Sequence, residues 1–155
     1  MTPLFGKKSK KNTVPVEETW SVFRGRNDDK DIVLRLNTGY VGKIMSATHP
    51  YQVGVTTGLR TPTENGTPSA EENAELQAIE DLIESRFGKN KNLLFVAAIC
   101  TGDTKELIYY TNDPVHVYPA LEKVRDDIST HEVRTIMQLD EGWSVYRHFA
   151  EMAGL

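Results

Sequence analysis

Residues 92–111 read NLLFVAAICTGDTKELIYYT, and this stretch indicates the fold class. Its first half is almost wholly apolar, which is typical of a strand in the middle of a sheet. Gly102-Asp103 supplies a turn, and the alternation of residues 105–111 predicts an antiparallel partner strand. The centre of the fold is therefore predicted to be a β-hairpin.

Helices are predicted before and after this hairpin. Ser69 and Glu72 have the capping-box spacing, in which each side chain binds the backbone N–H of the other residue. An apolar stripe at three- and four-residue spacing follows: Leu76, Ile79, Ile83 and Phe87. After the hairpin, Asp113-Pro114 signals the start of a second helix. Because Pro119 would break helical hydrogen bonds, the regular part of that helix is predicted to begin near Tyr118.

Two more predicted strands enclose these elements. Residues 51–60 read YQVGVTTGLR and residues 132–139 read EVRTIMQL, and both are rich in β-branched or alternating apolar residues. In chain order from residue 51 the elements are therefore β-α-β-β-α-β. This order is typical of a ferredoxin-like α+β fold, with an antiparallel sheet and both helices on one face. The other face is expected to be exposed unless a flanking element covers it.

Flanking elements are predicted at both ends. Residues 19–24 and 31–36 predict an N-terminal β-hairpin extension, and residues from 140 onward predict a short C-terminal helix. The segments EETWSVFR (17–24) and DEGWSVYR (140–147) are identical at five of eight positions. Two interpretations stay open: chance similarity, or two tryptophans that anchor flanking elements to the same sheet.

Composition predicts a single domain over residues 16–155, preceded by a flexible basic tail, residues 1–15. The tail carries four lysines and no acid, so the net charge of −4 leaves −8 on the rest of the chain. Such an acidic body disfavours nucleic-acid binding. No segment has the length and apolarity of a transmembrane helix or signal peptide, so we expect a cytoplasmic protein.

Four stretches together resemble a known family, the uncharacterised bacterial family called domain of unknown function 695. The resemblance covers most of the chain beyond the tail and implies a ferredoxin-like fold, and it brings no active-site residues. The stretches are TWSVFRGRNDDKDIVLRLN (19–37), TPSAEENAELQAIEDLIESRF (67–87), LLFVAAICTGDTKELIYYTND (93–113) and EGWSVYRHF (141–149).

The sequence contains no recognised catalytic motif. It lacks the glycine-rich loops that bind nucleotide phosphates and the GxSxG turn of a nucleophilic serine. Cys100 lies in an apolar strand and is predicted to be a buried, unreactive thiol. No two of the four histidines have metal-binding spacing: His49, His116, His131 and His148. We therefore expect no metal, no cofactor and no catalytic residues.

The first helix carries four glutamates predicted to lie off its apolar stripe: Glu71, Glu75, Glu80 and Glu84. They are interpreted as a solvated face, with an acidic docking surface as the alternative. Basic residues cluster instead around the N-terminal hairpin and are candidates for an anionic-ligand site: Arg24, Arg26, Arg35 and Lys43. Surface charge balance explains the same residues.

The hypothesis favoured by the sequence is a non-catalytic, protein-binding or regulatory module that acts at the helix-free sheet face or the hairpin edge. One alternative is a small-pocket enzyme or ligand-binding protein that uses the loop 38–51, where Arg35, His49 and Tyr51 converge. Another is an RNA-binding or RNA-processing regulator that stacks bases on Tyr109 and Tyr110. The identity of the protein partner and the oligomeric state stay open.

Overall fold

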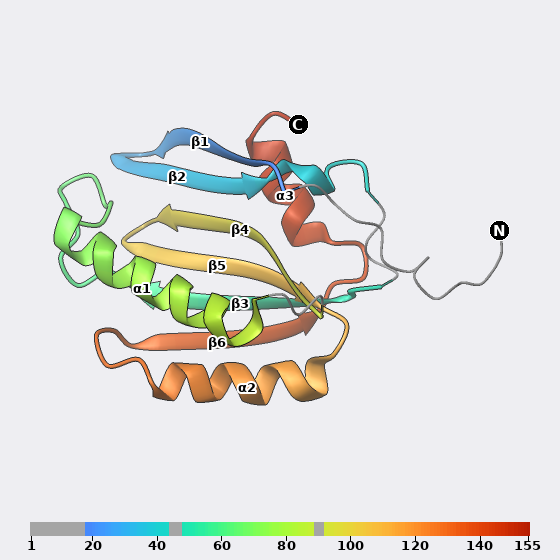
Figure 1. Cartoon of the computed structure of the whole chain (residues 1–155). Coiled ribbons are helices and arrows are strands. Elements are labelled where there is room, and N and C mark those ends of the chain that lie inside the picture. Colours follow the sequence, from blue (N-terminus) through green and yellow to red (C-terminus); the bar gives the residue numbers. More distant parts are fainter. Residues whose placement is uncertain (1–17, 44–47, 89–91) are drawn as a thin grey trace, which may run out of the picture.

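The described part of the chain forms one six-stranded antiparallel sheet with three α-helices, an α+β architecture (Figure 1). The computed structural model describes residues 18–43, 48–88 and 92–155, so the predicted tail (1–15) lies outside it. The strands are β1 (Trp20–Asn27), β2 (Lys30–Asn37), β3 (Tyr51–Gly58), β4 (Leu93–Thr101), β5 (Thr104–Thr111) and β6 (Val133–Leu139). The helices are α1 (Ala70–Phe87), α2 (Pro114–Asp126) and α3 (Ser144–Met152), with a short 3-10 helix, η2 (Thr38–Tyr40).

The strands lie in the order β1-β2-β4-β5-β3-β6. Both predicted hairpins are confirmed: β1 pairs with β2 and β4 with β5, each through a two-residue turn. In the β4–β5 turn, Gly102 and Asp103 have φ values of 58° and 66°, the left-handed geometry that matches the twist of the flanking strands. The apolar strand β4 lies inside the sheet, as its composition predicts.

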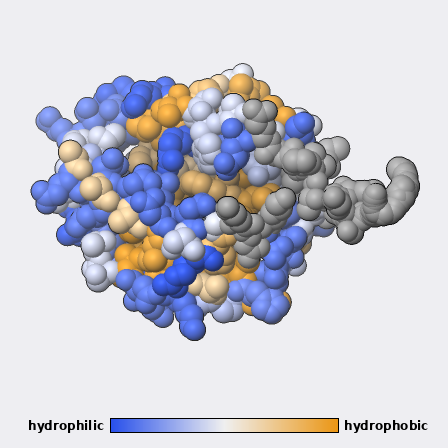
Figure 2. Space-filling view, viewed as in Figure 1, coloured by the Kyte–Doolittle hydropathy of each residue, from blue (hydrophilic) through white to orange (hydrophobic). Residues whose placement is uncertain are grey.

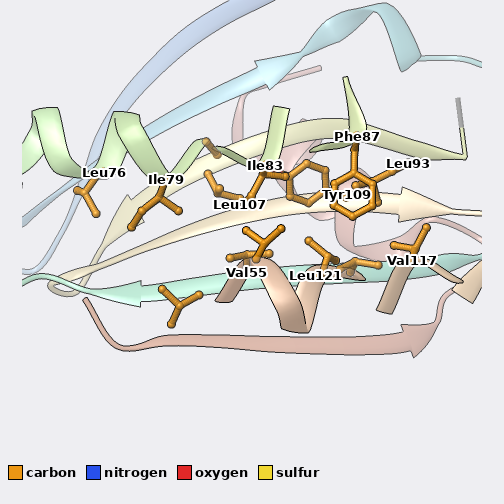
Figure 3. Packing of buried hydrophobic residues seen from close by; sticks show 14 residues of the cluster. Val55, Leu76, Ile79, Ile83, Phe87, Leu93, Leu107, Tyr109, Val117 and Leu121 are labelled. Atoms are coloured by element: carbon orange, nitrogen blue, oxygen red, sulfur yellow. The ribbon is translucent and has the colours of Figure 1, made fainter. Parts of the chain in front are cut away.

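Helices α1 and α2 cover one face of the sheet (Figure 1). Figure 3 shows α1 side chains, including Ile83 and Phe87, directed at Leu107 and Tyr109 of β5, while Leu121 packs from α2. Full burial of each such side chain contributes roughly 1.5–3 kcal/mol, so this layer provides much of the folding free energy. In the described segments, no helix combines the length and apolarity needed to cross a bilayer.

Helix α3 packs on the opposite face and covers part of it. Trp143 just before α3, and Tyr146 and Phe149 within it, join a second buried cluster with Leu36 and Tyr110 of the sheet. An irregularity between Phe95 and Ala97 shifts the register of β4. With one buried cluster under α1 and α2 and the other under α3, the sheet has an apolar layer on each side.

Helix α2 is longer than the sequence predicts. It begins at Pro114 and includes Pro119, which was expected to delay its start to about Tyr118. Pro119 is exposed, as is Val115 one turn before it, so water can bind the carbonyl oxygen left without its helical N–H partner. Tertiary packing of Val117, Leu121 and Val124 outweighs the lost hydrogen bond.

Half of the predicted capping box forms at the start of α1. The Ser69 hydroxyl accepts a hydrogen bond from the Glu72 N–H at 3.2 Å, as predicted. The Glu72 carboxylate does not bind the backbone N–H of Ser69. It accepts hydrogen bonds from the backbone N–H groups of Arg60 and Thr61 instead. The reciprocal bond is absent because the carboxylate has buried donors within reach.

Replacing Ser69 by alanine is expected to lower the free energy of unfolding by about 1 kcal/mol, because the Glu72 N–H loses its side-chain acceptor. Chemical denaturation measures this change. Ser85, near the other end of α1 and exposed, provides a control, and Ser85→Ala should cost less. Equal effects of the two substitutions would contradict a capping role for Ser69.

The similar segments around the two tryptophans form different structures. Trp20 begins β1 and packs against Phe95, with ring centroids 4.9 Å apart. Trp143 has a left-handed backbone at the start of α3 and stacks on Tyr110 at 4.1 Å. Both tryptophans contact the same sheet, but from opposite faces, so the similarity is not a structural repeat.

Candidate functional site

Strand β1 forms one edge of the sheet and is paired with β2 alone among the described strands. The register places Val22 opposite Arg35 and Arg24 opposite Val33. Since alternate residues of a strand point to the same side, these side chains share the sheet face on which α1 lies. We call this surface the hairpin face: Trp20, Val22, Arg24, Val33 and Arg35. Figure 2 shows apolar and hydrophilic surface side by side over β1 and β2.

Arg35 is held in place from three sides. Its Nη2 atom donates to both carboxylate oxygens of Glu80, at 2.8 and 2.7 Å. Its guanidinium carbon lies 6.0 Å from the centre of the Trp20 ring and 5.9 Å from that of Phe95, within range for cation–π attraction. These contacts attach the hairpin to α1.

Glu80 is the centre of a buried ion cluster. Its carboxylate also accepts a hydrogen bond from Lys105 Nζ at 2.5 Å, and the Glu80 side chain is 8% exposed. Burial alone would raise the pKa of Glu80, but the hydrogen bonds from Arg35 and Lys105 outweigh it and lower the pKa. The prediction that Glu80 lies on a solvated face is wrong, whereas Glu71 and Glu84 are exposed.

The other basic candidates divide between two surfaces. Arg24 is exposed, and no ion pair is formed by it within the described segments. Arg26, on the same side of β1, is also exposed and pairs with Asp31 at 2.8 Å. Lys43 lines a pocket beside α3 instead. The structure therefore brings Arg24, Arg26 and Arg35 to one face and leaves Lys43 apart.

The predicted convergence of Arg35, His49 and Tyr51 does not occur. Tyr51 begins β3, and strands β4 and β5 lie between β2 and β3 in the sheet. His49 is buried, and its carbonyl oxygen accepts a hydrogen bond from Trp143 Nε1 at 2.7 Å, on the α3 side. His49 thus supports the start of α3 rather than forming a site with Arg35.

Tyr109 and Tyr110 are both buried, with 4% and 0% of their surface exposed. Tyr109 stacks on Phe95 under α1, with ring centroids 4.9 Å apart. The Tyr110 hydroxyl donates to Asp140 at 2.7 Å on the other face. Since base stacking needs an exposed ring face, neither tyrosine can serve the predicted RNA-binding role.

One of three comparisons with known proteins found a match. The model of a family of unknown function, DUF695, matches residues 18–150. The chain belongs to this family. The match extends from the residues just before β1 into α3, so it includes the whole hairpin face. A search of curated proteins and a search of solved structures each found no match.

A second buried polar cluster in the DUF695 region was not predicted from the sequence. The Glu72 carboxylate accepts hydrogen bonds from the backbone N–H of Arg60 at 2.5 Å and of Thr61 at 2.8 Å, and lies 2.6 Å from His131 Nε2. Burial alone would raise the pKa of Glu72, but these hydrogen bonds lower it to about 2. The cluster connects α1 to the loop after β3 and to the segment before β6.

Cys100 is partly buried on the α1 side of β4, in register with Lys105. Burial raises the pKa of its thiol, although the charges of Lys105 and Arg35 act in the opposite direction. The thiol is therefore protonated near neutral pH, the state that is least reactive as a nucleophile.

Proposed function

We propose that this chain is a non-catalytic module that binds an extended segment of a partner protein along β1. The observation that carries the proposal is an eight-residue edge strand beside a partly apolar face, with Val22 53% exposed. An edge strand offers unpaired N–H and C=O groups, and an added strand binds them through main-chain hydrogen bonds. Side chains at alternate positions then provide specificity.

The chemistry of β1 favours a partner segment that alternates apolar and acidic residues. The strand reads WSVFRGRN and contains two arginines and no acid. An apolar partner residue would pack beside Trp20 and Val22, and a carboxylate would pair with Arg24. Because exposed ion pairs contribute at most about 1 kcal/mol, the main-chain bonds supply most of the affinity and Arg24 supplies selectivity.

The ion cluster makes this edge rigid before a partner arrives. Arg35 ties β2 to Glu80 of α1, and Trp20 packs on Phe95 of β4. A surface already held in its binding conformation loses little entropy when a ligand binds. The Glu80 ion cluster therefore holds β1 and β2 in position for binding, but Glu80 and Lys105 do not contact the partner in this proposal.

Replacing Val22 by glutamate is expected to reduce capture of the partner from a lysate of the native cells at least tenfold. The new charge removes apolar contact and repels an acidic segment. Val115→Glu is the matched control, because Val115 is 75% exposed on α2, away from β1, and this variant should capture normally. Both variants should keep the thermal midpoint of the wild type.

Captured material is identified by mass spectrometry with and without nuclease. A nuclease-resistant protein that is lost with Val22→Glu and retained with Val115→Glu supports the proposal. Recovery of RNA alone, or a protein captured equally by both variants, would overturn it.

We also propose the finer fold assignment, in which the segment from β3 to β6 is a ferredoxin-like unit. Its support is the chain order β3-α1-β4-β5-α2-β6 together with the sheet order β4-β5-β3-β6. The β1–β2 hairpin then extends that unit beyond β4. Bacterial origin and a cytoplasmic location stay predictions from the sequence.

A further inference from the structure

A pocket of about 520 Å³ lies between α3 and the segment that follows β2. Its volume falls in the range of about 300–1,000 Å³ that is usual for small-molecule sites. The aromatic residues Tyr40, Trp143 and Tyr146 line it, together with Lys43, Arg147 and Glu151. It belongs to the α3 side of the sheet, so it is separate from the hairpin face.

The aromatic wall of the pocket is fixed by contacts on its far side. Trp143 donates its indole N–H to the carbonyl oxygen of His49 at 2.7 Å and stacks on Tyr110. The Tyr146 hydroxyl donates to the Asn37 carbonyl oxygen at 2.7 Å. Tyr40 packs against Trp143 with ring centroids 5.4 Å apart. Trp143 and Tyr146 cannot turn away without breaking buried hydrogen bonds, and Tyr40 is held by ring packing. The three rings are 3–8% exposed, so they form a fixed base of the pocket that exists before a ligand binds.

The left-handed backbone at Trp143 directs its indole ring toward the pocket. Its φ of 54° is rare for a bulky residue and is retained where the surrounding structure compensates for it. Compensation comes from Asp140, whose carboxylate accepts hydrogen bonds from the N–H groups of Ser144 and Val145, at 2.9 and 3.1 Å. The strained turn places the indole between Tyr110 and the pocket.

The charged groups of the pocket favour an anion. Lys43 and Arg147 are exposed, and in the described parts of the chain neither side chain forms an ion pair, while Glu151 carries the one acidic side chain among the lining residues. Gly142 makes room for Arg147, because a Cβ atom at position 142 would lie 2.9 Å from Arg147 Nη2. The guanidinium thus lies against the turn that carries Trp143.

We propose that this pocket binds a small carboxylate with an apolar body. The body packs mainly against Val41 and Leu155, which are 41% and 53% exposed, because the three rings behind them are largely buried. The carboxylate is bound by Arg147 with Lys43 nearby. Arg147 suits this role since a guanidinium can bind both oxygens of a carboxylate. The proposal concerns a second site and does not depend on a protein partner at β1.

The test uses 2-naphthoate and its neutral analogue 2-naphthamide as probes. The chain has two tryptophans, so Trp20→Phe leaves the indole N–H signal of Trp143 alone in a proton–nitrogen NMR spectrum. Saturable movement of that signal with 2-naphthoate is expected. The dissociation constant for 2-naphthoate should rise at least tenfold in Arg147→Gln, while 2-naphthamide should bind both proteins equally.

Two further variants sharpen the result. Gly142→Ala should weaken 2-naphthoate binding several-fold, because the added Cβ displaces the guanidinium. Arg134→Gln, an exposed arginine on β6, is the matched control and should bind as the wild type does. No saturable shift, or equal affinity for the two probes unchanged by Arg147→Gln, would overturn the proposal.

Discussion

Replacing Glu80 by glutamine is expected to lower the free energy of unfolding by about 3–5 kcal/mol, the usual effect of removing one partner from a buried ion pair. Lys105, whose side chain is 10% exposed, would lose its only described carboxylate partner. Arg35 would lose the carboxylate whose two oxygens both accept hydrogen bonds from it. The effect is large because a buried ammonium without a partner is poorly solvated. Urea denaturation at pH 7 measures it.

Glu84→Gln is the matched control for that prediction. Glu84 is one turn further along α1 and exposed, so its replacement should change the free energy of unfolding by less than about 0.5 kcal/mol. The double variant Glu80→Leu with Lys105→Met should recover most of the loss, because it removes both buried charges together. A Glu80→Gln protein as stable as the Glu84→Gln protein would show that the ion cluster does not stabilise the fold.

The second large effect expected is a loss of stability between pH 4.5 and pH 2 that depends on Glu72. Its pKa is about 2 in the folded chain and near 4.5 when unfolded. The folded state therefore favours the ionised carboxylate, and this contribution is complete above pH 4.5 and disappears as the pH falls through 2. A shift of this size corresponds to about 3 kcal/mol.

Glu72→Gln should be less stable than the wild type at pH 7 and should lose this part of the acid sensitivity. Glu71→Gln, an exposed neighbour, provides the control and should keep the wild-type profile. Denaturation midpoints measured from pH 7 to pH 2 distinguish them. Parallel pH profiles for the wild type and Glu72→Gln would contradict the assigned role of the carboxylate.

Local patterns predicted most of the elements, because periodicity and turn residues act over a few positions. The alternation in residues 105–111 and the Gly102-Asp103 turn sufficed for the β4–β5 hairpin. The stripe from Leu76 to Phe87 sufficed for α1. Helix α2 differs because burial of Leu121 and its neighbours, a tertiary effect, outweighs the local preference of Pro119.

The candidate site was predicted less completely, because it depends on strand order. Glu80 lies four residues from Leu76, on the buried side of α1, but its partners Arg35 and Lys105 come from β2 and β5. No local signal reports that these strands approach the same turn of the helix. The same limit explains why the predicted convergence of Arg35 with Tyr51 was wrong, because that prediction required β2 and β3 to be neighbours in the sheet.

The pocket beside α3 was also beyond local patterns. The sequence predicts a terminal helix with an aromatic side, which α3 confirms. Which sheet face the helix covers depends on the strained turn at Trp143 and on its hydrogen bond to His49, a residue 94 positions earlier. The alternative of a ligand site using the loop 38–51 named Arg35, His49 and Tyr51, none of which lines this pocket.

Amide hydrogen exchange on the captured complex tests the central claim most directly. If a partner segment adds to the sheet at β1, the outward-facing amides of residues 20–27 should exchange at least tenfold more slowly in the complex than in the free chain. Amides of α2 should be unchanged and provide the internal control. Protection that falls on β6 or on the helices, with β1 exchanging at its free rate, would contradict the account.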